Sequence, residues 1–280
     1  MAKSDSSVAA LKKYIESEHL TLPVFDAVSL RIQLELVKKE PDFRIVEKFI
    51  VADQALSSNL LKIANSARFG GLVEISTVKS AIMRVGMAEI SRMITMDINQ
   101  KMFSSRDRQV NLIMKKLWQH SMGCAFAAGL LSKRLDFGVM QNEAFFAGLF
   151  HDIGKLLVLK VIAEKKKKDT SLVVTDEMLY DALDLLHAEQ GYLLMQQINM
   201  PEAYSVIARD HHLQYFDREN YLLILVRMAN LVCHHLAIGL IVYDSSTPLL
   251  ETEEALLLEL ADADLEALRV FLASTPSLTQ

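Results

Sequence analysis

The run from Phe145 to Leu157 places ionisable side chains inside an otherwise apolar stretch. It reads Phe-Phe-Ala-Gly-Leu-Phe-His-Asp-Ile-Gly-Lys-Leu-Leu, with His151 and Asp152 side by side. Burying a charge is costly unless the group is paired, hydrogen-bonded or bound to a metal ion. The pair is therefore either an ion pair between packed helices or a pair of metal ligands. Imidazole and carboxylate together suit Zn, Fe, Mn or Ni.

Composition narrows the class of protein around this run. Hydrophobic residues make up 51% of the 280 residues, which is enough for a sizeable core. The net charge of −5 gives no basic excess for phosphate contacts, so no DNA or RNA partner is expected. Only Cys124 and Cys233 are present, and the N-terminus lacks the apolar core of a signal peptide. A cytoplasmic protein is expected.

One stretch, Tyr221–Val242, is apolar enough to imitate a membrane span. Arg227, Asn230, His234 and His235 interrupt it, and an Arg at the centre of a span costs about 2.5–3.5 kcal/mol on insertion scales. We therefore expect a buried core helix there and no membrane span.

Apolar residues recur three or four apart along most of the chain, without sustained alternation, which predicts an all-α fold. Asp42 and Asp53 are expected to cap helices of the first part. The longer expected helices are Ser7–Glu18, Ala27–Lys38, Thr77–Val85, Ala88–Met102, Val110–Leu135, Asn142–Val161, Asp176–Leu186, His187–Ile198, Tyr221–Val242 and Glu251–Phe271.

A polar break at Ser104–Arg108 suggests where the first part ends. The predicted division is an N-terminal helical lobe (1–108), a helical lobe with the histidines (109–245), and a C-terminal amphipathic helix with its tail (246–280). The four lysines from Lys165 to Lys168 are expected at a solvated helix end.

Six candidate metal ligands gather in the second part of the chain. A single histidine on an apolar face is more often a core residue than a ligand, but five with an aspartate in one helical half are harder to explain in that way. A helical bundle can bring such side chains from several helices to one interior point. The candidates are His120, His151, Asp152, His187, His211 and His212.

Three motifs in this half resemble the HD superfamily of metal-dependent phosphohydrolases. They are Leu117–Ser121, Ala147–Leu156 and Leu186–Gly191. Short motifs in the first half resemble the HDOD family, bacterial signalling proteins with an HD-related output domain: Asp53–Leu56, Leu60–Ser66, Ser80–Ile82 and Val85–Gly86. The resemblance, over about residues 22–236, implies a two-lobed all-helical protein with a C-terminal HD-like bundle.

The resemblance also implies a ligand set, which this chain keeps only in part. His120, His151 and Asp152 match the HD metal ligands, and His187, His211 and His212 match additional ligands of the related HD-GYP phosphodiesterases. One or two divalent transition metal ions (Fe, Mn, Ni or Zn) would be the cofactor.

Two acidic ligands of the fuller pattern are replaced. Asn230 stands where an Asp is expected, and Lys116 stands where a Glu is expected, with its charge predicted toward the same interior as His120. Asn230 itself and His234, one turn after it, are weaker candidate ligands, and His234 is more simply a core or surface histidine. The Gly-Tyr-Pro motif of HD-GYP proteins is absent, since the chain reads Gly191-Tyr192-Leu193.

These departures favour a signalling or interaction module with a degenerate metal site and a protein partner. The alternative is an active phosphodiesterase or phosphatase acting on a nucleotide, with a cyclic dinucleotide as one candidate. Asp152 and Lys155 would then be catalytic, with Lys155 on a phosphate. In a non-enzyme, Lys155 would be a surface lysine. A third reading makes the histidines a polar network of the core, without metal. Cys124 and Cys233 are expected to be inert structural thiols.

Overall fold

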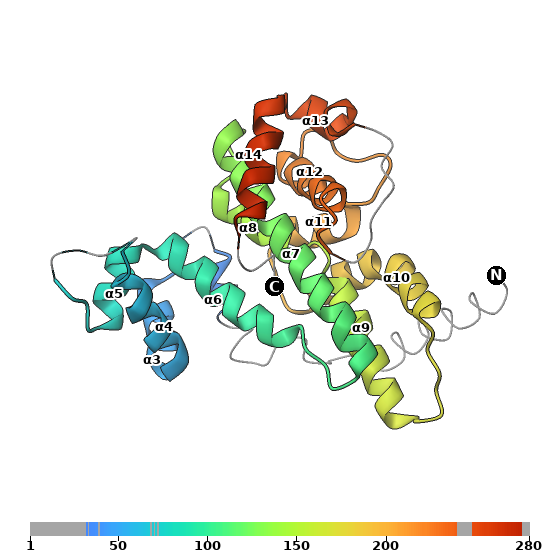
Figure 1. Cartoon of the computed structure of the whole chain (residues 1–280), viewed down its shortest axis with the longest axis horizontal. Helices are drawn as coiled ribbons and strands as arrows, with labels where there is room; N and C mark the ends of the chain where they lie inside the picture. Colours follow the sequence, from blue (N-terminus) through green and yellow to red (C-terminus); the bar gives the residue numbers. More distant parts are fainter. Residues whose placement is uncertain are drawn as a thin grey trace. The chain divides into compact units, whose positions relative to one another are not determined.

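The computed structural model describes residues 32, 34–38, 40–67, 69, 71, 73–239 and 248–275, and in these ranges the regular secondary structure is helical, with no strand (Figure 1). The all-α prediction is confirmed. The expected helix Ser7–Glu18, most of the helix Ala27–Lys38 and residues 240–242 of the helix Tyr221–Val242 lie outside the described residues. The prediction for Tyr221–Val242 is too long, because the helix ends at His235 and Ala237 adopts a positive φ of 55°. Across these same ranges, every helix is too short or too polar to cross a membrane.

The described residues fall into two compact units, one ending at Met102 and the other beginning at Phe103. The first unit contains α3 (Phe43–Ala52), α4 (Gln54–Ala64), α5 (Val78–Val85) and α6 (Met87–Met102). Both expected caps are present, because the Asp42 carboxylate accepts from the Arg44 amide and the Asp53 carboxylate accepts from the Ala55 amide, each at 2.8 Å.

The second unit holds the remaining helices. They are α7 (Arg108–Leu135), α8 (Gln141–Phe150), α9 (Ile153–Lys168), α10 (Asp176–Gln197), α11 (Glu202–Asp210), α12 (Tyr221–His235), the 3-10 turn η1 (Leu249–Glu251), α13 (Glu253–Leu257) and α14 (Asp262–Ala273). The predicted domain limits at 108/109 and 245/246 stay a prediction.

Helix α7 is the longest of the described helices, and several helices of the second unit pack against it. Its first turn is capped by Asp107, whose carboxylate accepts from the Val110 amide at 2.9 Å. The helix ends at Leu135, and the next residue, Asp136, adopts the left-handed conformation. Helices α8, α12 and α14 pack on it, while α10 packs on α9 and α11 (Figure 1). His120 lies near the middle of α7 and is thus held between neighbouring helices.

The predicted helix Asn142–Val161 is wrong as a single element, because α8 ends at Phe150 and α9 begins at Ile153. The backbone turns at His151 and Asp152, and Asp152 leaves helical geometry at φ −102°, ψ 17°. The apolar residues on both sides gave no sign of this turn, because both helices are buried. The turn presents the two ionisable side chains at the junction of two helices.

Two further helix predictions are wrong. The expected break between Leu186 and His187 does not occur, since α10 is continuous through both and neither residue breaks a helix. The expected C-terminal helix Glu251–Phe271 is divided into α13 and α14, because Glu259 adopts a positive φ of 51° between them.

Two glycines allow the helices around the turn to approach closely. A Cβ at Gly154, in the first turn of α9, would overlap the carbonyl oxygen of His187 in α10. A Cβ at Gly148 in α8 would lie 2.6 Å from the carbonyl oxygen of Cys124 in α7. These contacts bring α7, α9 and α10 around His151 and Asp152.

Candidate metal centre

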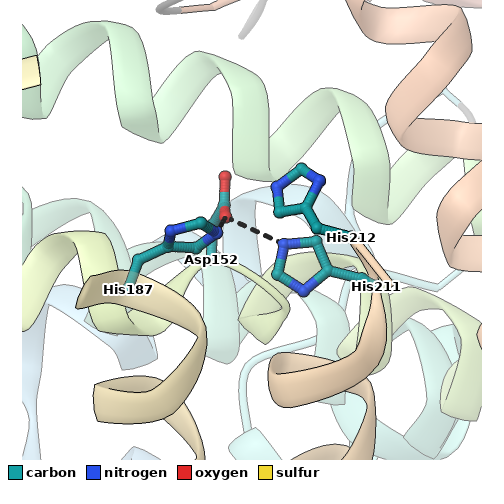
Figure 2. Close-up of side chains that lie close together, drawn as sticks. All are labelled: Asp152, His187, His211 and His212. Atoms are coloured by element: carbon teal, nitrogen blue, oxygen red, sulfur yellow. Dashed lines mark ion pairs between the residues drawn. The ribbon is translucent and has the colours of Figure 1, made fainter. Parts of the chain in front are cut away.

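The carboxylate of Asp152 is the centre of a cluster of histidines. Its Oδ1 lies 3.6 Å from Nε2 of His187 and 3.4 Å from Nε2 of His211. Its Oδ2 lies 3.6 Å from Nε2 of His120 and 3.4 Å from Nε2 of His151. Figure 2 shows the first half of this cluster, with His187 and His211 beside the carboxylate. Each oxygen of Asp152 therefore faces two imidazole nitrogens from different parts of the second unit.

The cluster is closed to solvent. The side chains of Asp152 and its four facing histidines are each at most 3% exposed. Lys155, one turn into α9, is also buried and places Nζ 2.7 Å from Oδ2 of Asp152. The prediction that Lys155 would lie at the surface in a non-enzyme is wrong, because its position three residues after Asp152 directs it to the same interior.

Backbone carbonyls fix the orientation of all four imidazoles. Nδ1 of His120 donates to the carbonyl of Ile238 at 3.0 Å. Nδ1 of His151 donates to the carbonyl of Gly148, and Nδ1 of His187 donates to the carbonyl of Leu183, each at 2.7 Å. Nδ1 of His211 donates to carbonyls of the same helix. A carbonyl oxygen only accepts, so each Nδ1 must carry the proton. In a neutral imidazole, the Nε2 that faces Asp152 then carries a lone pair and no proton.

Burial keeps the rings of His120, His151 and His187 neutral. It lowers the pKa of His120 and of His187 to about 4, against the attraction of Asp152, and it lowers the pKa of His151 well below 6.5. Burial alone would raise the pKa of Asp152, but Lys155 and the surrounding histidines more than offset this and hold the pKa well below its usual range. At neutral pH the centre thus combines a carboxylate with imidazole lone pairs.

This arrangement fits a divalent metal ion. The Nε2 atoms of the four histidines face the carboxylate oxygens of Asp152 at 3.4–3.6 Å. Nε2 of His151, His187 and His211 and Oδ1 of Asp152 are buried without a hydrogen-bond partner among the described residues. Buried polar atoms are rarely left so, and a ligating histidine typically donates its other N–H to a carbonyl, as here. The cluster is therefore a potential divalent-metal site.

The other predicted ligands lie at the edge of this cluster. His212 is exposed, and its ring lies 5.1 Å from that of His187 between centroids. It joins Asp152, His187 and His211 in one group of ligand atoms within 4.8 Å of one another (Figure 2). His234 is buried in α12 with its ring 4.9 Å from that of His120. Asn230, also buried, lies one turn before it.

The prediction for Lys116 is wrong. Its side chain is exposed and lines a surface cavity of about 500 Å³ with Arg108 and Tyr180. Helix α7 directs His120 inward and Lys116 outward, although the two are four residues apart. The positive charge inside the cluster comes from Lys155 instead.

Residues that the sequence did not single out support the cluster. The Arg227 guanidinium donates to the carbonyls of His211 at 2.8 Å and of Leu213 at 2.9 Å, where α11 ends, and pairs with the buried Glu254. Gly239, at φ 119°, lets the segment after α12 lie against His120. Cys124, one turn after His120, places Sγ 3.5 Å from its Nε2. Only Cys124 could have been noticed from its spacing.

Comparison with known proteins places the chain in a family. The model of the HDOD domain matches residues 22–214. The chain belongs to the HDOD family. This confirms the resemblance seen in the sequence, and with it the all-helical HDOD fold.

The curated relatives are distant and longer. An uncharacterized protein of Treponema pallidum is 26% identical over 68% of this chain and 37% of its own length. The cyclic di-GMP phosphodiesterase CdgJ of Vibrio cholerae is 23% identical over 52% of this chain and 31% of its own length. The chain thus spans about a third of the length of the curated relatives it matches.

Solved structures share the fold over nearly the whole chain. A protein of Shewanella amazonensis named as a candidate metal-dependent phosphohydrolase aligns with a TM-score of 0.68 and 20% identity, covering 96% of this chain and 99% of its own. An HDOD protein of unknown function from Geobacter sulfurreducens aligns with a TM-score of 0.64 and 19% identity, covering 96% and 98%. At these identities the likeness concerns the fold.

Proposed function

We propose that this HDOD protein is a signal-transduction module whose buried centre binds a divalent transition metal and acts as a regulatory centre without efficient turnover. The observation that carries this is the burial of the centre, since Asp152 and the four histidines facing it are each at most 3% exposed. Structural metal sites are closed, whereas catalytic ones keep a position open to water or substrate. A phosphodiester would have no free approach to Asp152.

The donor set suggests how the ions would be held. One ion would be bound by Oδ1 of Asp152 with His187 and His211, with exposed His212 completing the set. A second would be bound by Oδ2 with His120 and His151. Fe, Mn, Ni and Zn all suit imidazole with carboxylate. When bound, such an ion would act as a Lewis acid on a coordinated oxygen.

The protein's own residues weaken this chemistry. Lys155 already neutralises Oδ2 of Asp152 at 2.7 Å, so an ion on that oxygen would bind next to an ammonium group. Asn230 supplies no negative charge where the fuller HD pattern has a carboxylate. Both features support lower affinity on the His120 side, and hence a site that responds to metal supply or to a bound partner. We expect a signalling protein as that partner, and a nucleotide ligand is a further candidate.

The alternative function is an active phosphodiesterase or phosphatase acting on a nucleotide. It is favoured by the carboxylate shared between two pairs of histidines and by the likeness to CdgJ of Vibrio cholerae, which is named a cyclic di-GMP phosphodiesterase. Asp152 would then organise the site and Lys155 would contact a phosphate oxygen. This requires Lys155 to leave Asp152 and the centre to open.

A hydrolysis assay separates the two functions. The purified protein, loaded in turn with Mn, Fe, Ni or Zn, is incubated with bis(p-nitrophenyl) phosphate and with cyclic di-GMP. The proposal predicts that the wild type hydrolyses both compounds no faster than the Asp152→Ala variant. It also predicts that binding of the metal, and of a nucleotide or protein partner, is lost in Asp152→Ala. Turnover that exceeds the Asp152→Ala background with any of these metals would favour the enzyme.

A further inference from the structure

A thiol lies beside the half of the centre that is formed by His120, His151 and Oδ2 of Asp152. Cys124 follows His120 by one turn of α7, and its Sγ lies 3.5 Å from Nε2 of His120. The ligand atoms of His120, Cys124 and His151 all lie within 4.8 Å of one another, and all three residues are buried. Two nitrogens and a sulfur from α7 and the α8–α9 turn therefore converge on one point.

A hydrogen bond alone does not explain this convergence. The Cys124 thiol could donate weakly to Nε2 of His120, and it also contacts the thiol of Cys233 in α12. Nε2 of His151 would still be buried with no partner among the described residues. A cation between the three atoms would satisfy both imidazoles and the sulfur together.

We propose that Cys124 is a metal ligand, which supplies a negative charge to the His120–His151 side of the centre. The ligands on that side would be His120, His151, Cys124 and Oδ2 of Asp152. This rests on the proposed function, because it names a further ligand of the same metal centre. Binding of a divalent ion on this side would release the proton of the Cys124 thiol to solvent, so that the sulfur coordinates as a thiolate.

The thiolate would select the metal. Sulfur with imidazole suits Zn, Fe(II), Co(II) or Cu and disfavours Mg and Ca, which take oxygen ligands. Without metal, burial and the Cys233 thiol raise the pKa of Cys124 well above its usual value. The free protein therefore keeps this thiol protonated and unreactive, which separates it from cysteines activated for catalysis.

Cobalt spectroscopy tests the proposal. Co(II) is added to the metal-free chain of 280 residues, and the near-ultraviolet sulfur-to-cobalt charge-transfer band is followed with the visible d–d bands. We expect the charge-transfer band in the wild type and in the control variant Cys233→Ser, which removes a second buried thiol, on α12. In Cys124→Ser it should be lost, and affinity on that side should fall on the order of 100-fold. Circular dichroism checks that the variants fold.

The outcomes separate this proposal from the one on which it rests. Cobalt d–d bands without charge transfer in the wild type would overturn the role of Cys124 and leave the metal centre standing. No cobalt binding at all would overturn both. A band lost in Cys233→Ser but kept in Cys124→Ser would also overturn the assignment.

A second measurement does not depend on any variant folding. X-ray absorption of the zinc-loaded wild type should show a sulfur neighbour at about 2.3 Å, and a shell of nitrogen and oxygen alone would overturn the proposal.

Discussion

Lys155 is the residue whose role in the centre is easiest to isolate. It is buried against Oδ2 of Asp152 at 2.7 Å, so in the metal-free protein it is the cation that balances this carboxylate. Lys155→Met should lower the free energy of unfolding of the metal-free protein by roughly 3–5 kcal/mol, because it leaves a buried charge unpaired. Added Zn should then stabilise the variant more than the wild type, since the ion takes the place of the ammonium group.

Lys160 provides the matched control for this experiment. It lies on the same helix, half-buried, and burial lowers its pKa. Lys160→Met should therefore be neutral or stabilising. Urea unfolding with and without Zn measures both variants. Equal destabilisation in the two variants would mean that the loss comes from altered packing of α9 and not from Asp152.

The buried histidines make stability depend on pH. His120 and His187 have a pKa of about 4 in the folded protein and 6.5 when exposed. Between these values the unfolded chain binds more protons, so stability should be complete above pH 6.5 and should fall as the pH drops towards 4. The lowering of the pKa corresponds to a loss of at most roughly 3 kcal/mol in the free energy of unfolding for each histidine.

Urea unfolding of the metal-free protein at several pH values between 4 and 7.5 measures this dependence. The His187→Gln variant should show a shallower slope than the wild type. A free energy of unfolding that stays level or rises as the pH falls would contradict the assignment of neutral, buried imidazoles.

The sequence could predict which residues of the centre meet, but not how they meet. His120, His151, Asp152, His187 and His211 converge as predicted, because each lay in an apolar helical segment. Whether they bind metal stays a prediction. The partners of Nδ1 and the burial of Lys155 depend on where α8 ends, and apolar residues on both sides of His151 conceal that point.

At the scale of helices, Gly154 controls the approach of α9 to α10. A Cβ there would overlap the His187 carbonyl oxygen, a backbone atom that cannot move aside cheaply. Gly154→Ala should lower the free energy of unfolding by more than roughly 2 kcal/mol through overpacking and weaken metal binding, because it displaces His187. Thermal unfolding and metal titration measure both effects.

Gly129 in α7 is the control for this substitution. A Cβ there would meet only ordinary contacts, the nearest being the Gln141 carbonyl oxygen at 3.5 Å. Since Ala favours helix over Gly by about 1 kcal/mol, Gly129→Ala should be neutral or stabilising. If both variants behave alike, close approach at Gly154 is not what limits α9 and α10.

Helix caps were predicted better than helix interiors. Asp42 and Asp53 cap α3 and α4 as expected, because capping is a local interaction between a side chain and the next amides. The division of Asn142–Val161 and the continuity of α10 depend on tertiary packing. Periodicity is a weak guide there, since helices buried on most sides are apolar all round.

At the scale of the molecule, the centre is confined to one of two units. Its ligands come from α7, the α8–α9 turn, α10 and the end of α11, all after Phe103. A metal that binds only the folded state at 100 times its Kd would add about 2.7 kcal/mol to stability. Membership in the HDOD family could be predicted from short motifs spread over both units. Whether the centre catalyses a reaction could not be predicted from the sequence.

The central claim is that this cluster binds a transition metal, and elemental analysis tests it most directly. The chain of 280 residues is purified without chelators beside the variants His151→Ala and His235→Ala. His235 is an exposed histidine of α12 and serves as the control. The account predicts one or two equivalents of Fe, Mn, Ni or Zn per chain in the wild type and in His235→Ala, and a clear loss in His151→Ala. A metal-free wild type, or a His151→Ala variant with unchanged metal content, would contradict it.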